Sequence, residues 1–265
     1  MALKTAVNEA VRAALLRNNL RITRAIDAER LAGFFRDIKP VSTNHELIRV
    51  GGESDGGYLI PDDLEGIKTC FSPGVSSIAD FELGMASRGI QCFLADYSVE
   101  RPPVENPLFH FEKKFLGAAI DPVHTTLEDW VERNAPDQRE FLLQMDIEGS
   151  EYGVIFDTTA ETLRKFRILV IEFHALGSLC DQLGFELIDL TFKKLMKDFE
   201  IVHIHPNNSL KPVVYAGYAV PMTMEFTFLR KDRISSRQPT TKFPHKLDRP
   251  NVAGNEDPAL PSCWF

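Results

Sequence analysis

Three acidic residues follow closely on one apolar run and offer the clearest chemistry in the sequence. The run Leu142–Met145 leads into Asp146 and Glu148, and Glu151 follows after Gly149. Asp146 and Glu148 share one side of an extended chain because successive side chains alternate, and Gly149 allows the chain to turn. Capping of the next helix would use only one of the acids. The others are available to bind a ligand, a cation or a proton.

Another acid, Asp96, ends the apolar run 91–95, roughly 20 residues after a turn of small residues at 72–77. Such a turn lets the backbone approach a ligand, and an acid at this distance binds ribose hydroxyls in doubly wound folds. An N-cap or turn acid is the alternative interpretation. The turn has neither the GxGxxG of a dinucleotide loop nor a P-loop GK[ST]. The pattern therefore indicates an adenosine cofactor without phosphates, such as S-adenosylmethionine, and disfavours a dehydrogenase.

Histidines end two further apolar runs. Glu172 and His174 alternate at the end of one, and His203 and His205 at the end of the next. If these two strands are neighbours, Asp146, Glu172, His174 and His205 converge at one edge of a sheet. A histidine there could accept the proton of a hydroxyl, or the four residues could bind Mg²⁺ or Mn²⁺. His203 is better interpreted as an interior histidine.

These motifs resemble a known family. Asp-Ile-Glu-Gly-Ser-Glu-Tyr at 146–152, followed by Leu-Val-Ile-Glu-Phe-His at 169–174, resembles the FkbM family of S-adenosylmethionine-dependent methyltransferases. The usual signature of that family is close to D-[VI]-E-G-x-E and then a strand ending in E-x-H. Asp-Gly-Gly-Tyr at 55–58 and Thr-Leu-Glu-Asp at 126–129 are similar to further elements of the group. The resemblance implies a Rossmann-like fold and methylation of a sugar hydroxyl in a polysaccharide, glycolipid or natural product.

The resemblance also implies roles for individual residues. Ser72 and Gly74 would contact the methionine part of the cofactor, and Asp96 would hold the ribose. Asp146 and Glu148 would lie near the transferable methyl group. The full set implied to bind the cofactor is Asp55, Gly56, Tyr58, Ser72, Gly74, Asp96, Asp146 and Glu148. The candidate catalytic residues are Asp146, His174 and His205, and the candidate ligands of a metal are Asp146, Glu172, His174 and His205.

The elements that must position these residues alternate along the chain. Short apolar runs and helical patterns predict an α/β fold with a mostly parallel sheet and helices on both faces, whose ligands bind beyond the carboxyl ends of the strands. The predicted strands are 67–72, 91–96, 109–116, 141–146, 168–174, 200–205 and 223–230. The predicted helices are 78–87, 127–133, 158–165 and 183–198.

Three segments are expected. Apolar spacing predicts two helices before the main domain, from Leu3 to Leu15 and from Ile26 to Ile38. We therefore expect an N-terminal helical extension at 1–44, a methyltransferase domain at 45–232 and an extended, proline-rich C-terminal tail at 233–265 that docks on the body or on a partner chain.

Composition narrows the class of protein. The 265 residues are 44% hydrophobic with a net charge of −8, which fits a globular chain and disfavours nucleic-acid binding. No apolar run approaches the roughly 18 residues that span a bilayer, and no secretory signal is evident, so a cytoplasmic location is expected. The four scattered cysteines argue against zinc and disulfides. Residues 1–40 carry a net +4 and the rest −12.

The sequence is compatible with several kinds of partner. The basic leader is suited to a peripheral membrane surface or a polyanionic partner, a glycosyltransferase is a further candidate, and a solvated helix face or a homodimer contact is the simpler interpretation. A sugar or glycan is the expected acceptor. Because the turn at 72–77 has a single glycine, a non-catalytic glycan- or partner-binding protein on a degenerate methyltransferase scaffold is the alternative function.

Overall fold

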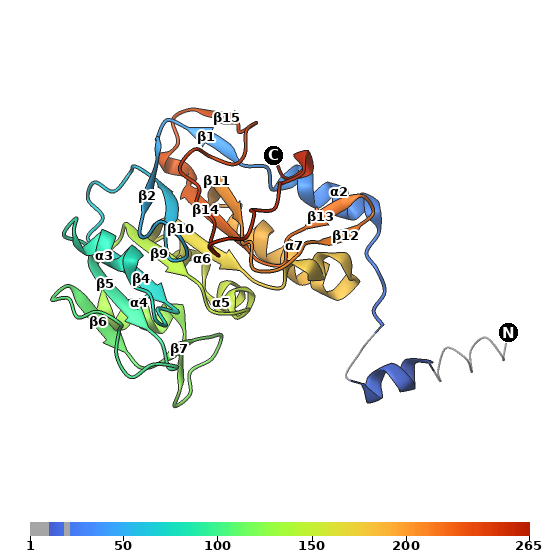
Figure 1. Ribbon diagram of the computed structural model, residues 1–265. Coiled ribbons are helices and arrows are strands. Elements are labelled where there is room, and N and C mark those ends of the chain that lie inside the picture. The colour runs from blue at the N-terminus through green and yellow to red at the C-terminus, as the bar shows by residue number, and fades with distance from the viewer. Residues whose placement is uncertain (1–10, 19–21) are drawn as a thin grey trace.

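A computed structural model describes residues 11–18 and 22–265 and contains a central sheet covered on both faces (Figure 1). The seven strands lie in the order β11-β14-β10-β9-β4-β5-β6, and β14 alone runs antiparallel to its neighbours. The predicted mostly parallel α/β fold is confirmed. The strands are β4 (Thr69–Pro73), β5 (Gln91–Ala95), β6 (Phe109–Glu112), β9 (Phe141–Met145), β10 (Phe166–Phe173), β11 (Phe199–Pro206) and β14 (Met224–Arg230).

Two hydrophobic cores lie on the two faces of the sheet. All eight residues of β10 are buried; Leu169 and Ile171 belong to one core, and Ile168 and Val170 to the other. A parallel strand that is buried on both faces reads as a continuous apolar run for this reason. The helices α2 (Ala28–Asp37), α4 (Leu127–Asn134), α5 (Glu151–Asp157) and α7 (Gln182–Leu195) contribute to the first core. The second is covered by α3 (Asp80–Ala86) and the hairpin β2 (Leu47–Val50) and β3 (Tyr58–Pro61).

The position of β14 corrects one expectation. We predicted that the strands bearing His174 and His205 could be neighbours, but β14 lies between them. Glu225 of β14 is opposite Glu172 of β10 on one side and opposite His205 of β11 on the other. Because neighbouring strands are about 4.8 Å apart, His205 is two strand spacings away from Glu172.

Several smaller elements also differ from the prediction. The predicted strand 109–116 is divided into β6 and β7 (Phe115–Leu116), and β7 pairs with β8 (His124–Thr125). Lys113 and Lys114 interrupt the apolar alternation of Phe109 and Phe111, which marks the break. The predicted helix 158–165 is the shorter α6 (Ala160–Leu163). The hairpins β2–β3 and β12 (Val213–Tyr215)–β13 (Tyr218–Val220) were not predicted, nor was the pairing of β1 (Val41–Thr43) with β15 (Arg237–Pro239).

Helix α2 and the last residues of the chain pack together on the first core. Helix α2 begins after the N-cap Asp27 and corresponds to the second predicted helix. Its Phe35 packs edge-on against Trp264. The indole nitrogen of Trp264 donates a hydrogen bond to the carbonyl of Ala219. The first predicted helix is described only at residues 11–17, where the chain is helical; Leu3 and Val7 lie outside the described residues. The short 3₁₀ helices are η1 (Leu176–Cys180), η2 (Lys231–Arg233) and η3 (Ser262–Trp264).

The domain boundaries at residues 44 and 232 stay predictions. Among the described residues, none of the helices has the length and apolar character to cross a bilayer.

Candidate active site

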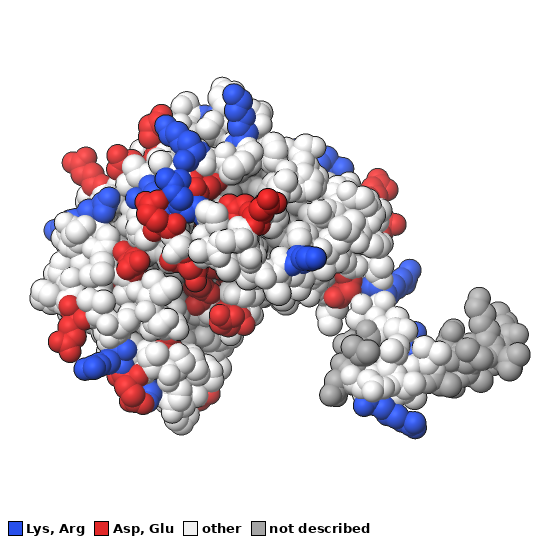
Figure 2. All heavy atoms as spheres, in the orientation of Figure 1, with Lys and Arg blue, Asp and Glu red and all other residues white. Residues whose placement is uncertain are grey.

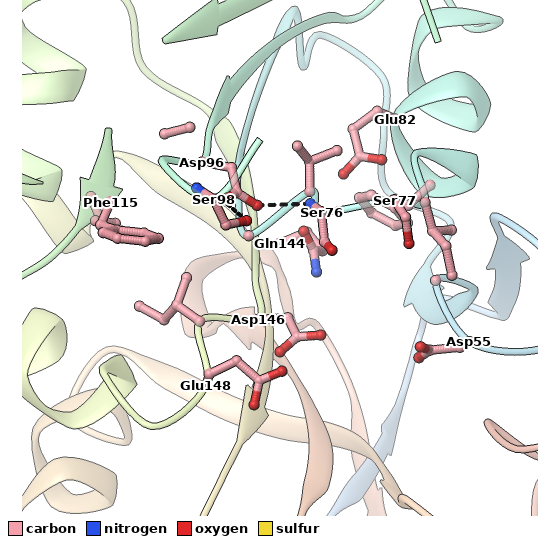
Figure 3. A pocket seen from close by; sticks show the side chains of 18 of the residues that line it. Asp55, Ser76, Ser77, Glu82, Asp96, Ser98, Phe115, Gln144, Asp146 and Glu148 are labelled. Atoms are coloured by element: carbon pink, nitrogen blue, oxygen red, sulfur yellow. Dashed lines mark hydrogen bonds between the residues drawn. The ribbon is translucent and has the colours of Figure 1, made fainter. Parts of the chain in front are cut away.

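A cavity of about 730 Å³ opens at the carboxyl ends of β4, β5 and β9 (Figure 3). This is the edge at which the sequence placed the chemistry. In Figure 3, Asp96 and Asp146 lie on different sides of the open space, and Asp55 projects from a third. Seven of the eight residues implied to bind the cofactor line the cavity: Asp55, Gly56, Tyr58, Gly74, Asp96, Asp146 and Glu148.

The turn after β4 fits closely against the end of β9. Gly74 has a φ of +90°, and a Cβ atom built on it would lie 1.7 Å from the carbonyl oxygen of Asp146. Its amide donates to the carbonyl of Ala95 at 3.0 Å. The single glycine of this turn is therefore required both by its backbone conformation and by the close approach of two strand ends.

Asp96 holds this turn in place. One carboxylate oxygen accepts a hydrogen bond from the amide of Ser76 at 2.8 Å, and the other accepts from the amide and the hydroxyl of Ser98 at 2.8 and 2.6 Å. A carboxylate has about four lone-pair sites, so these three bonds leave capacity for one further donor on the cavity side. Asp96 thus shapes the cavity wall and also faces its interior.

Ser72 does not line the cavity, which corrects its expected contact with the cofactor. It is fully buried, and its hydroxyl contacts both the carboxyl group of Glu82 and Oε1 of Gln144, the latter at 2.5 Å. With Oε1 of Gln144 accepting the Ser72 proton, the contact with Glu82 is a hydrogen bond when Glu82 is protonated and donates to Ser72, because one hydroxyl proton cannot serve two acceptors. Burial raises the pKa of Glu82 to about 7, in agreement with this assignment. Gln144 in turn donates to the Tyr58 hydroxyl at 3.2 Å.

The loop between β9 and α5 is organised by Glu151. This residue is fully buried, and its Oε1 accepts from the amides of Ile147 and Gly149 at 3.2 and 3.1 Å. Glu148, between them, has a left-handed φ of +57°, a conformation that is strained for a residue with a side chain. We name residues 146–151 the acid loop.

His174 is oriented by the same carboxylate. Its Nδ1 lies 3.1 Å from Oε1 of Glu151, so the ring presents Nε2 to Oδ1 of Asp146 at 3.8 Å and to Oε2 of Glu148 at 3.5 Å. Tyr152 donates to the His174 carbonyl at 2.7 Å and fixes the strand end as well. Two of the three residues that the sequence proposed for catalysis, Asp146 and His174, are therefore brought together.

The surroundings of Asp146 and His174 raise the pKa values of both side chains. Burial and the neighbouring carboxylate of Glu172 raise the pKa of Asp146 to about 8. Burial lowers the pKa of His174, but the hydrogen bond with Glu151 and the surrounding carboxylates outweigh it and raise the pKa to about 9. Acidic side chains also gather near the middle of the face shown in Figure 2. The site is therefore suited to a cationic ligand.

Asp146, Glu148 and His174 could hold a divalent metal ion. One ligand atom from each lies within 4.8 Å of the others, and Oδ1 of Asp146 is buried without a hydrogen-bond partner among the described residues. Two carboxylates and one imidazole suit Mg²⁺ or Mn²⁺. Glu172, expected as a ligand, instead accepts a hydrogen bond from Asn207 at 2.8 Å and acts on the group through its charge.

His205 does not belong to this group, which corrects its proposed catalytic and metal-binding roles. The C-terminal tail covers it, and its Nδ1 lies 3.8 Å from Oδ2 of Asp248, whose Oδ1 lies 2.9 Å from Nε2 of His203. Burial lowers the pKa of His205, but Asp248 and Glu225 raise it to about 9. Both histidines are nearly inaccessible to solvent and hold the tail on the sheet.

Sequence reasoning missed part of the cavity wall. Gln144 could have been found, since it precedes Asp146 by two positions and faces the same way. Ser98 could have been found as a turn partner of Asp96. Phe115 lies in the short strand β7, and nothing in its local pattern indicated that the strand reaches the cavity. These residues line it together with Ser76, Ser77, Glu82 and Leu116.

Comparison with known proteins agrees with this geometry. Residues 86–194 match the model of the methyltransferase FkbM domain, a segment that includes β5, β9, the acid loop and β10. This match supports the resemblance to FkbM methyltransferases that the motifs at 146–152 and 169–174 carry. Together with the order of the sheet, this match confirms the predicted Rossmann-like methyltransferase fold. S-adenosylmethionine is the usual cofactor of this family.

Solved structures resemble the chain at low identity. WbdD with the kinase inhibitor LY294002 is 14% identical over 69% of this chain and 41% of that chain, with a TM-score of 0.38. A TehB-like S-adenosylmethionine-dependent methyltransferase from Corynebacterium glutamicum is 11% identical over 86% and 99% of the two chains, with a TM-score of 0.32. The chain thus spans about two fifths of the length of WbdD. None of the curated proteins compared with it matches.

Proposed function

We propose that the protein is an S-adenosylmethionine-dependent O-methyltransferase that methylates a sugar hydroxyl. The observation that carries the proposal is that Asp96 and Asp146 line one cavity, on either side of the turn at Gly74. Asp96 would accept a ribose hydroxyl, and Phe115 and Leu116 offer an apolar wall for adenine. Asp146 and Glu148 would face the positively charged sulfonium, which the acidic site favours.

The acid loop and His174 would promote the transfer. The bond between sulfur and the methyl carbon breaks as the carbon bonds to the acceptor oxygen, and the hydroxyl proton must leave. His174 could take that proton at Nε2, held in place through Nδ1 by Glu151. Because the pKa of His174 is about 9, this role needs alkaline pH or a change in the nearby charges.

A bound cation would make the transfer independent of His174 as the base. Mg²⁺ or Mn²⁺ held by Asp146, Glu148 and His174 would supply Lewis acidity that lowers the pKa of the acceptor hydroxyl. Asp146 and His174 must then release their protons to become ligands. Sensitivity of the activity to EDTA separates this version from the histidine-base version.

Calorimetry with S-adenosylmethionine and S-adenosylhomocysteine tests the proposal directly. Asp96→Ala should weaken both ligands by at least about tenfold, the effect expected when a hydrogen bond to a charged group, worth about 1.5–3 kcal/mol, is lost. Glu100→Ala is the matched control, because Glu100 lies in the same loop, pairs with the exposed Lys113 and is not among the residues that line the cavity. No binding to folded wild-type protein would contradict the proposal.

Turnover separates the enzyme from the non-catalytic alternative. Binding of S-adenosylmethionine without transfer of a labelled methyl group to any glycan extract would favour a glycan- or partner-binding protein on this scaffold. The single-glycine turn no longer favours that alternative, because Gly74 is the residue at which the strand ends make their close approach.

We further propose a cytoplasmic protein that meets a glycan acceptor and does not bind nucleic acid. All four cysteines are free, as expected in a reducing compartment. The exposed Arg12 and Arg17 of the leader suit peripheral contact with an anionic membrane or a glycosyltransferase, and a homodimer contact is the alternative. Flotation with anionic vesicles and sedimentation would distinguish them.

A further inference from the structure

A second cavity, of about 720 Å³, lies on the other side of the acid loop. It is bounded by the beginning of α5, by η1, by the first half of α7 and by the segment 22–24, which is held to the start of α7 by a bridge between Ala25 and Asp181. Its volume is that of a site for a drug-sized ligand. We call it the amphiphilic cavity.

The floor of the amphiphilic cavity adjoins the reacting groups. Gly149 and Ala175 line it, and they directly follow Glu148 and His174 in the chain. Tyr152 also lines it and donates to the carbonyl of His174. Ala175 has a left-handed φ of +54°, a strain that surrounding contacts must maintain. The floor is thus built from the residues that directly follow Glu148 and His174 in the chain.

The rim of the cavity is apolar and exposed. Leu183 and Leu187 are 71% and 42% exposed and stand one helical turn apart on α7, and Ile22 faces them from the N-terminal segment with 56% exposure. Large apolar side chains gathered around a concavity mark a binding surface more strongly than scattered ones do. The rim is therefore suited to the apolar part of a ligand.

Polar donors also line the cavity. Arg24 and Gln182 line the cavity, and within the described parts of the chain neither side chain forms a hydrogen bond or ion pair with another side chain. A guanidinium and an amide offer donors to hydroxyl or phosphate oxygens. Arg24 and Gln182 are exposed, so the cavity offers polar donors beside its apolar rim, which matches a ligand that has a polar head and an apolar extension.

We propose that the amphiphilic cavity binds the acceptor, and that the acceptor is a saccharide linked to an apolar chain. The sugar would lie near Gly149 and Ala175, and the chain would lie along Leu183, Leu187 and Ile22. This inference rests on the proposed function and narrows its substrate class to amphiphilic sugars, whether free glycosides or glycolipids in a membrane.

Binding of octyl glucoside below its micellar concentration tests the proposal without cofactor or turnover. Calorimetry should show binding of octyl glucoside and at least about tenfold weaker binding of glucose, because the buried alkyl chain supplies much of the affinity. Leu183→Asp should weaken octyl glucoside binding by about tenfold. This change suits the first turn of α7, where an acid is favourable, so the fold should be retained.

Leu190→Asp is the matched control. Leu190 is 50% exposed on the same helix but is not a residue of the cavity wall, so its variant should bind octyl glucoside as the wild type does. Equal weakening in both variants, or equal binding of glucose and octyl glucoside, would overturn the proposal.

A vesicle experiment identifies the source of the ligand. Vesicles that contain a glucosyl lipid should retain the protein through Leu183 if the acceptor is a membrane glycolipid, whereas binding of the monomeric glycoside alone indicates a free amphiphile. Absence of both contradicts the amphiphilic cavity as the acceptor site. Because neither measurement uses S-adenosylmethionine, that result would leave the proposed methyltransferase activity standing, and only failure of cofactor binding would remove it.

Discussion

Glu151, fully buried at the start of α5, accepts a hydrogen bond from Nδ1 of His174 at 3.1 Å. The same oxygen accepts from two amides of the acid loop. One carboxylate therefore sets both the shape of the loop that carries Asp146 and Glu148 and the direction in which His174 presents Nε2. Glu151 is a positioning residue for the site rather than a group that faces a ligand.

Glu151→Gln should lower the pKa of His174 from about 9 towards the ordinary value, because Glu151 makes the hydrogen bond that raises it. The pKa of a histidine in the unfolded chain is about 6.5, so the raised pKa of His174 stabilises the folded state fully below that pH. The stabilisation is lost as the pH rises through about 9. The variant should thus lose more stability at pH 6 than at pH 10. NMR titration of the His174 ring and urea denaturation at both pH values would measure this.

Glu148→Gln is the control for that experiment. The side chain of Glu148 is 88% exposed, so its charge is screened by solvent and its removal should shift the His174 pKa much less. Equal shifts of the His174 pKa in the two variants would contradict the role of Glu151 as its main hydrogen-bond partner.

Gly74→Ala should destabilise the fold by about 2–4 kcal/mol, since the new methyl group would overlap the Asp146 carbonyl and force two strand ends apart. Gly89→Ala is the control: Gly89 has a φ of +76°, but nothing lies within 4 Å of its added Cβ. That variant should lose only about 1–2 kcal/mol for the left-handed backbone. Chemical denaturation compares the two, and equal losses would argue against the close approach.

Glu82→Gln should make the protein more stable at pH 8 than the wild type and change little at pH 4. The buried Glu82 has a folded pKa of about 7 against an ordinary value of 4.5, so the wild type loses stability as pH rises between these values. This difference in pKa corresponds to about 3 kcal/mol. Denaturation at the two pH values measures it. A variant less stable at pH 8 would mean that Ser72 requires a charged partner.

Manganese binding should depend on Asp146 and His174 but not on His205. Binding should release protons at pH 7, because Asp146 and His174 hold them there with pKa values of about 8 and 9, and the affinity should rise with pH. Calorimetry in buffers of different ionisation enthalpy counts the protons. Asp146→Asn and His174→Gln should abolish manganese binding, and His205→Gln should retain it. Loss of binding in His205→Gln alone would mean that His205 is a ligand, as the sequence predicted.

The residues at the strand ends could be predicted because a titratable side chain directly follows an apolar run at each of them. Asp96, Asp146 and His174 each follow a buried apolar run, and parallel strands bring their carboxyl ends to one edge. His205 was misplaced because a sequence does not reveal strand order: the run that contains Glu225 is as apolar as its neighbours, and nothing local says that it enters between them.

The buried role of Ser72 was equally hidden. Its place at the end of β4 was correct, but alternation cannot tell whether a strand-end hydroxyl faces a cavity or a buried partner such as Glu82. That distinction depends on helix α3, which brings Glu82 over the sheet. The amphiphilic cavity was not foreseen for a similar reason, since segment 22–24 and α7 are far apart in the chain.

The place of β14 sets when the sheet can be completed during synthesis. β11 touches the rest of the sheet through β14, yet β14 ends at Arg230 and is the last strand of that sheet to leave the ribosome. Until it emerges, β10 presents an unpaired edge to the cell, and edges of this kind invite pairing with other chains. The seven-stranded sheet therefore cannot be complete before residue 230 has been synthesised, and until then the facing edges of β10 and β11 have no partner within it.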